Sequence, residues 1–148
     1  MNIINCSEHY LDKLVVLFEE YRFFCGFERS PKETKAFLKK LIVNEESVIF
    51  IAVDPETDSI MGFVNLYPSY STLALQRLWI LNDLGVSGDF RGKGVSKALI
   101  FKVQEFAKQS NAIRIELKTG CTNTTALSLY QSMNFTVDTD NVYYRVPC

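Results

Sequence analysis

The apolar residues of this chain change their spacing twice, and this change limits which folds are open to it. Before Val48 they recur every three or four residues, as on one face of an α-helix. From Val48 to Val53 they form an unbroken run rich in β-branched residues, which is typical of a buried strand. After Gly94 the helical spacing returns. A chain that alternates in this way predicts helices packed on a central sheet.

Read along its full length, the pattern predicts one mixed three-layer α/β (α+β) domain over residues 1–148, since this length leaves room for little else. The second helix has a clear start signal: Ser30 is a candidate N-cap, Pro31 suits the first helical position, and Glu33 stands where a capping box needs a glutamate. The expected helices cover residues 7–24, 31–42, 95–110 and 122–133. The expected strands cover residues 3–4, 48–53, 60–67, 78–86, 113–117, 135–137 and 142–146.

Composition excludes several classes of protein. Lys and Arg number 16 and Asp and Glu 17, a net charge of −1, whereas a general nucleic-acid binder carries a basic surplus. The four cysteines form no C-x-x-C pair and His9 is the only histidine, so no usual metal-binding spacing is present. No charged leader precedes an apolar stretch, and no run approaches about 18 apolar residues. We therefore expect a cytoplasmic protein without a metal or a membrane span.

The most informative segment is the glycine-rich turn Val86–Ser96, which links a strand end to a helix start. A helix N-terminus presents unpaired N–H groups, and glycine lets a phosphate approach the backbone. Arg91 and Lys93 add full charges, so a pyrophosphate is the natural ligand. Neither a Walker loop nor a Rossmann turn fits, because Gly94 and Lys97 stand where those motifs need other residues. On these residues alone, an ordinary tight turn with two solvated basic side chains remains open.

Together with its surroundings, the turn resembles the signature of the GNAT superfamily of acyl-CoA-dependent N-acetyltransferases. In the family pattern Q/R-x-x-G-x-G/A, Arg91 and Gly94 match, and Ser96 replaces the final Gly or Ala with another small residue. A second family element is an asparagine before a helix with A-x-x-L-Y and then G-F. The matching residues here are Asn123, Ala126, Leu129, Tyr130 and Phe135, with Asn134 in place of the glycine.

A narrower similarity concerns four short segments. They resemble the branch that contains fungal histone and polyamine acetyltransferases and their bacterial relatives, in which dimers are common. A homodimer is therefore a further expectation. The segments are Tyr21-Arg22, Glu46–Phe50, Leu66–Pro68 and Trp79–Leu84.

The resemblance implies a fold and a way of binding acetyl-CoA. The fold is a mixed central sheet of about six to seven strands, splayed between the fourth and the fifth and flanked by about four helices. The main chain of Leu84 and Val86 would hold the pantetheine arm between the splayed strands and polarise the thioester carbonyl. The pyrophosphate would bind the backbone amides of the turn. These amides belong to Arg91, Gly92, Lys93, Gly94, Val95 and Ser96.

Two residues of the second element carry implied roles. Tyr130 stands where the family has its usual general acid for the departing CoA thiolate, and Asn123 where a side chain contacts CoA or fixes the helix start. A phenol of pKa about 10 protonates a thiolate of pKa about 8.5 at a cost of roughly 2 kcal/mol, so a hydrogen bond to the sulfur is the alternative role. Without the family pattern, the residues alone would indicate that Tyr130 is a core tyrosine and that Asn123 only caps the start of its helix.

The acceptor side is predicted from the fourth strand and the first helix. Some family members use a carboxylate or histidine on that strand to take the proton of the amine, but Ile80 and Asn82 stand at the matching positions. We therefore expect the proton to leave through water or directly to solvent, with Asn82 orienting the substrate. Strand alternation places Asp83 on the face opposite Asn82. The predicted substrate-binding residues are Tyr21, Arg22, Glu28, Tyr67 and Asp83.

These implications predict an N-acetyltransferase that moves an acetyl group from acetyl-CoA to a primary amine by direct attack in a ternary complex. The acceptor would be a polyamine, an amino acid, another small amine or a protein lysine, and nucleic acid is not an expected partner. The alternative is a non-catalytic acyl-CoA-binding or interaction module on the same fold, because no general base is identified and Ser96 departs from the pattern.

Overall fold

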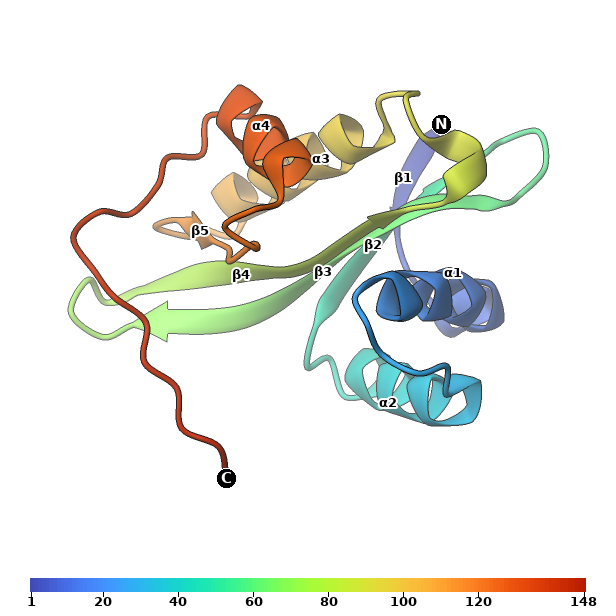
Figure 1. The fold of residues 1–148 in the computed structure, drawn as a ribbon, viewed down its shortest axis with the longest axis horizontal. Helices are drawn as coiled ribbons and strands as arrows, with labels where there is room; N and C mark the ends of the chain where they lie inside the picture. The colour runs from blue at the N-terminus through green and yellow to red at the C-terminus, as the bar shows by residue number, and fades with distance from the viewer. The chain divides into compact units, whose positions relative to one another are not determined.

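Five strands in the order β1-β2-β3-β4-β5 form the sheet at the centre of the structure (Figure 1). The computed structural model describes residues 1–148. The sheet lies in the unit Met1–Lys118, and Thr119–Cys148 form a second unit. All neighbouring strands are antiparallel except β4 and β5, which are parallel and are therefore joined by a helical crossover. The strands are β1 (Asn2–Asn5), β2 (Val48–Val53), β3 (Ile60–Ser71), β4 (Gln76–Val86) and β5 (Ile115–Glu116).

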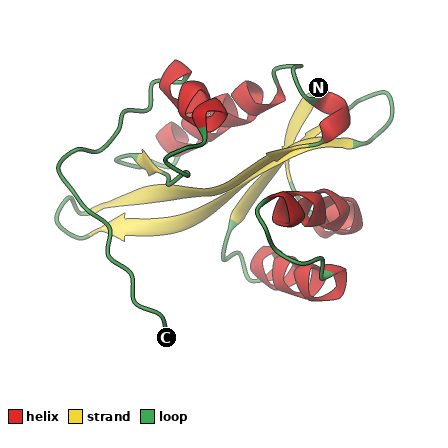
Figure 2. Ribbon diagram, in the orientation of Figure 1, coloured by secondary structure: helices red, strands yellow, loops and turns green.

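Helices cover both faces of this sheet (Figure 2), with α1 and α2 on one face and α3 on the other. Alternate residues of β3 face the two layers, as the side-chain period of a strand requires. The Phe63 ring packs against Phe18 and Tyr21 of α1, with ring centroids 4.9 and 5.4 Å away. Its neighbour Gly62 lies against Val95 of α3. The helices of this unit are α1 (Leu11–Phe24), α2 (Pro31–Val43) and α3 (Val95–Gln109).

The helical predictions are confirmed within a few residues. A 3-10 turn (Glu8–Tyr10) precedes α1, and α4 (Thr124–Ser132) lies in the second unit. The predicted capping box of α2 does not form. The Ser30 side chain makes no cap bond, and the backbone N–H of Ser30 donates to Glu19 of α1 instead of to Glu33. No helix of the structure is both long and apolar enough to cross a membrane.

The sheet has fewer strands than the six to seven expected. Residues 135–137 and 142–146 were predicted as strands, but the second unit contains no strand, and these segments form no ladder with one another. An extended segment becomes a strand only when its backbone N–H and C=O groups pair with a neighbour, and alternation of apolar residues does not supply that neighbour. The expectation of one domain over residues 1–148 stays a prediction.

The predicted splay between the fourth and fifth strands is present. β4 and β5 pair only at Trp79 and Ile80, whereas β4 continues to Val86 in its pairing with β3. The ladder with β3 is also irregular: Asn65 faces Asp83 but Leu66 faces Leu81, so Asn82 is the extra residue of a β-bulge. β4 therefore leaves the β5 side free along its C-terminal half and changes direction at the same point.

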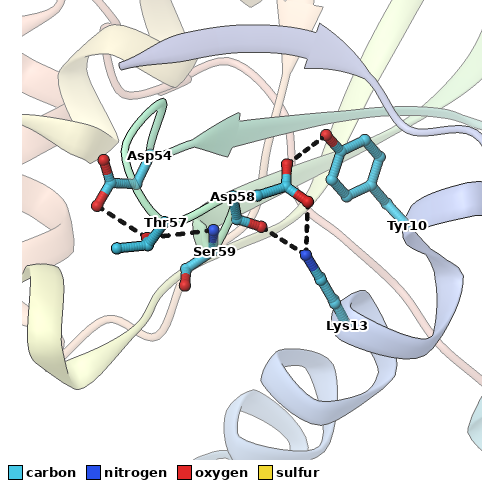
Figure 3. A network of polar contacts seen from close by, with 6 residues as sticks. All are labelled: Tyr10, Lys13, Asp54, Thr57, Asp58 and Ser59. Atoms are coloured by element: carbon cyan, nitrogen blue, oxygen red, sulfur yellow. Dashed lines mark hydrogen bonds and ion pairs between the residues drawn. The ribbon is translucent and has the colours of Figure 1, made fainter.

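A polar network fixes the turn between β2 and β3 to the start of α1 (Figure 3). Asp58, in the left-handed conformation at φ 57°, accepts from the Tyr10 hydroxyl at 2.8 Å and from Lys13 Nζ at 2.7 Å. Asp54 accepts from the Thr57 hydroxyl at 3.0 Å within the turn. These hydrogen bonds lie in solvent-exposed positions, so the network orients the turn more than it stabilises the fold.

Gly62→Ala tests the close approach of α3 to the sheet. A Cβ at this position would lie 2.8 Å from Val95 Cγ1 and 2.9 Å from the Gly85 carbonyl oxygen, so β3, β4 or α3 must shift. We expect a loss of about 1–3 kcal/mol in the free energy of unfolding, measured by urea denaturation. Gly88→Ala is the control, because a Cβ there meets nothing within 4 Å. Equal midpoints for the two variants would contradict the close packing.

Candidate active site

The glycine turn ends at a helix N-terminus that is open to an anion. Gly92 and Gly94 adopt φ angles of 73° and 77°, in the left-handed region that strains a side chain. Gly94 is the N-cap residue of α3, no side chain caps the helix, and its first turn contains no acidic residue. Arg91 and Lys93 are exposed, with Lys93 Nζ 5.2 Å from the centroid of the Phe90 ring. This arrangement offers free N–H groups and positive charge to a phosphate.

The residues next to the turn include buried and half-buried positions on α3 and β4. Val95 is buried and anchors the helix start on Gly62, while Ser96 is half-buried. Leu84 and Val86 are half-buried on the part of β4 that extends past its pairing with β5. Their main-chain groups on that side are free to bind an extended ligand.

A cavity of about 440 Å³ lies between β3, β4 and the pair of helices α1 and α2. Aromatic and aliphatic side chains make up half of its lining, and the rest is largely polar or charged, a mixture that suits a small polar molecule. The polar and charged side chains that line it include Arg22, Glu33, Thr34, Asn65, Asn82 and Asp83; the aromatic ones are Phe18, Tyr21, Phe27, Phe37 and Tyr67.

Asp83 is the centre of the polar groups in this cavity. Its Oδ1 accepts from the Tyr21 hydroxyl at 3.1 Å, and its Oδ2 accepts from Asn65 Nδ2 at 2.9 Å and from Asn82 Nδ2 at 3.0 Å. All three donors are neutral, and Asp83 forms no ion pair. Burial and the nearby Asp83 charge raise the pKa of Tyr21, so its hydroxyl stays a donor. The site therefore holds an oriented negative charge without a positive partner.

The prediction that Asp83 points away from Asn82 is wrong. Both side chains line the same cavity, and they are hydrogen-bonded to each other. The physical reason is the bulge at Asn82, which inserts an extra residue and breaks the alternation of side chains across the sheet. The two polar residues near the end of this strand thus act at one site.

The structure brings together most of the predicted acceptor-side residues. Tyr21, Arg22, Tyr67, Asn82 and Asp83 all line the cavity. Burial raises the pKa of Tyr67, so this phenol also stays neutral. Glu28 is exposed and does not line the cavity; its backbone carbonyl accepts from Arg22 Nη1 at 3.0 Å.

Two polar residues of this region were missed by the sequence analysis. Asn65 is 1% exposed, and its Oδ1 has no hydrogen-bond partner. Glu19 is buried at the helical spacing of the apolar face of α1, between Val15 and Arg22. In both cases a polar residue interrupts an apolar stretch, and this is the signal that could have revealed them.

The second unit carries the other predicted residues. Asn123 Oδ1 accepts from the Ala126 N–H at 3.1 Å, so Asn123 is the N-cap of α4. Tyr130 lies on the same helix, with its ring centroid 5.6 Å from that of Phe135. Burial raises the pKa of Tyr130 above its ordinary value, which keeps its hydroxyl protonated.

The first unit is thus a three-layer α/β fold with an uncapped helix N-terminus after a glycine turn and a separate cavity that contains Asp83. The sequence model of the "Acetyltransferase (GNAT) family" matches residues 12–135. The chain is 35% identical over 144 residues to "Uncharacterized N-acetyltransferase YhfO" of Bacillus subtilis, covering 97% of this chain and 95% of that protein. A "Probable acetyltransferase" of Haemophilus influenzae is 37% identical over 119 residues, covering 79% of this chain and 81% of the relative.

A solved structure agrees with this relationship. The "Crystal structure of a probable acetyltransferase" superposes with a TM-score of 0.96 at 36% identity, covering 100% of this chain and 98% of the other. The chain belongs to the GNAT family of acetyltransferases and is an acyltransferase.

The buried carboxylate of Glu19 leads to a prediction on acid stability. Burial raises the pKa of Glu19, but hydrogen bonds from Thr34, Ser30 and Arg22, together with the Arg22 charge, lower it more, so its net pKa lies below the ordinary value. A carboxyl group with a lowered pKa stabilises the fold above its unfolded pKa and loses this contribution as the pH falls through the folded one.

Between about pH 6 and pH 3 the wild type should therefore lose more stability than Glu19→Gln, which has no proton to gain at this position. Urea midpoints of the two proteins at several pH values measure this. Parallel pH dependences would show that the Glu19 carboxylate does not stabilise the fold.

Proposed function

We propose that this protein transfers the acetyl group of acetyl-CoA to a primary amine by direct attack in a ternary complex. One observation carries the proposal: the Asp83 carboxylate accepts from three neutral donors, has no ion-pair partner, and lines a cavity with several aromatic walls. The strand that carries Asp83 is unpaired along its other edge past Ile80. A negative charge in such surroundings favours a cation, and an amine acceptor is a cation at neutral pH.

The residues of the glycine turn fit the diphosphate of acetyl-CoA. The uncapped N-terminus of α3, with Gly92 and Gly94 in left-handed conformations, supports binding of phosphate oxygens by the amides from Arg91 to Ser96. The free edge of β4 at Leu84 and Val86 supports pairing with the amide groups of the pantetheine arm. When bound there, acetyl-CoA supplies the activated acetyl thioester.

On the acceptor side, Asp83 binds the ammonium group and Asn82 orients it toward the thioester. The Oδ1 of Asn65, which has no hydrogen-bond partner, adds a further acceptor beside Asp83 and suits N–H donors, not anions. Because neither Ile80 nor Asn82 is a base, the ammonium gives its proton to water, and the neutral amine that remains donates an N–H to the Asp83 carboxylate while its lone pair faces the thioester carbon. A main-chain N–H of β4 then stabilises the negative charge that develops on the thioester oxygen.

Tyr130 acts on the leaving sulfur. Because burial raises its pKa above about 10, full proton transfer to a thiolate of pKa near 8.5 is uphill. The phenol therefore serves chiefly as a hydrogen-bond donor to the departing sulfur. Asn123 fixes the start of the helix that carries Tyr130.

Binding of acetyl-CoA tests the first half of this proposal. At a concentration of about 100 times Kd, acetyl-CoA should stabilise the wild type by about 2.7 kcal/mol and raise its Tm by roughly 5–10 °C. Arg91→Ala and Lys93→Ala should each weaken binding by about fivefold at low salt, and by less as ionic strength rises. Lys108→Ala, at the other end of α3, is the matched control. No shift in the wild type would refute acetyl-CoA as the ligand.

Turnover tests the second half. Release of free CoA thiol is measured with polyamines, amino acids, aminoglycosides and lysine peptides, and at least one amine should react faster than hydrolysis. Asp83→Asn should lower kcat/KM for that amine by about 30- to 100-fold, because the ammonium loses its counter-charge, while acetyl-CoA affinity changes little. Glu105→Gln, an exposed position of α3, is the control. Binding of acetyl-CoA without release by any amine would instead indicate a non-catalytic acyl-CoA-binding module.

A further inference from the structure

The loop between α1 and α2, residues 25–30, forms part of the wall of the cavity and has little apolar burial of its own. Cys25 and Phe27 line the cavity, yet the Phe27 side chain is 60% exposed. Gly26 adopts a φ of 91°, which only glycine reaches without strain, so the loop makes a tight turn there. Hydrophobic packing therefore does not explain why the loop holds one position.

A carboxylate from α1 supplies what packing does not. Glu19 is 4% exposed, and both of its oxygens are used. Its Oε2 accepts from the Ser30 N–H at 2.6 Å, at the end of the loop. Its Oε1 accepts from the Thr34 hydroxyl of α2 and from Arg22 Nη1 at 3.0 Å. One buried group thus joins α1, the loop and α2.

Arg22 extends this connection to the middle of the loop. Its Nη1 also donates to the Glu28 carbonyl oxygen at 3.0 Å, and its guanidinium carbon lies 5.7 Å from the centroid of the Phe27 ring. The side chains of Glu19 and Arg22 thus hold the loop at Phe27, Glu28 and Ser30. They add to the backbone bonds from Gly26 and Phe27 to α1 and to the contact of Arg29 with the Phe23 ring. Charge-assisted hydrogen bonds of this kind are the stronger ones, and those of the Glu19 carboxylate are at least partly shielded from water, whereas the bond from Arg22 to Glu28 is exposed.

We propose that Glu19 is a positioning residue of the acceptor site: by binding Ser30, Thr34 and Arg22 it holds the α1–α2 loop in place as a preformed wall for the amine. This inference rests on the proposed function, because it takes the cavity to be the acceptor site. It assigns to Arg22, a predicted substrate-binding residue, the task of fixing the wall. Preorganisation of this kind lowers the cost of ordering the loop when the acceptor binds.

The isosteric substitution Glu19→Gln tests this. A carboxamide has one acceptor oxygen, and its NH₂ would face a donor group at Ser30, Thr34 or Arg22, so at least one of these bonds is lost. With the panel amine of highest kcat/KM, we expect KM for that amine to rise by about tenfold. The KM for acetyl-CoA should stay within about twofold, since the α3 turn lies on the other face of the sheet (Figure 1). Glu20→Gln, the exposed neighbour, is the matched control.

A second measurement follows the loop itself and needs no activity. Hydrogen exchange of the peptide that contains residues 25–30, and alkylation of Cys25 by iodoacetamide read by peptide mass, should both be faster in Glu19→Gln than in the wild type and Glu20→Gln. If Glu19→Gln fails to fold, Thr34→Val removes one bond with little change in volume, and Thr34→Ser should restore the wild-type rates.

The outcomes separate this inference from the proposed function. Unchanged exchange and alkylation in both Glu19→Gln and Thr34→Val would overturn the positioning role. An equal rise in KM for the amine and for acetyl-CoA would also overturn it, because that is the result of general destabilisation. A wild type that acetylates no amine would refute the proposed function, and the exchange rates would still decide whether Glu19 holds the loop.

Discussion

The C-terminal half of β4 is the constraint on which both sites depend. At Ile80 its pairing with β5 ends, and at Asn82 a bulge shifts its register against β3. The first change leaves backbone groups free on one edge, where the family's thioester ligand is proposed to bind. The second change places the side chains of both Asn82 and Asp83 in the lining of one cavity. A regular, fully paired strand at this position would provide neither feature.

Two glycines allow the helices to approach this strand and its neighbour. Gly62 of β3 lies directly against Val95 at the start of α3, so the glycine turn proposed to bind the diphosphate is packed on the sheet. Gly85 of β4 faces the other layer, where a Cβ would lie 2.6 Å from Phe63 Cε1 and 3.3 Å from Tyr21 Cδ1. The Tyr21 ring can therefore lie close enough for its hydroxyl to reach Asp83. Small residues on adjacent strands thus position the elements on both faces.

Local patterns predicted the elements of the first unit well. The helical spacing of apolar residues located α1, α2 and α3, and the expected acceptor-side residues of β4, Asn82 and Asp83, do line the cavity. The glycines at 92 and 94 were found because left-handed turns leave a recognisable sequence signal. These features depend on residues that are close together in the chain.

The errors arose where distant segments decide the outcome. The bulge that places Asp83 beside Asn82 exists only in the pairing of two strands, and single-strand alternation cannot reveal it. Ser30 was expected to use Glu33, but a carboxylate eleven residues earlier, Glu19, takes its N–H. The strands predicted at 135–137 and 142–146 lacked a pairing partner in their own unit. In each case the competing interaction comes from another element.

The most direct test of this account is a crystal structure of the protein with CoA and the amine that it acetylates fastest. The account predicts an amine nitrogen within about 3.2 Å of an Asp83 carboxylate oxygen, and the diphosphate at the amides of residues 91–96. An amine bound outside the cavity lined by Asn82 and Asp83, or a diphosphate away from the start of α3, would contradict it.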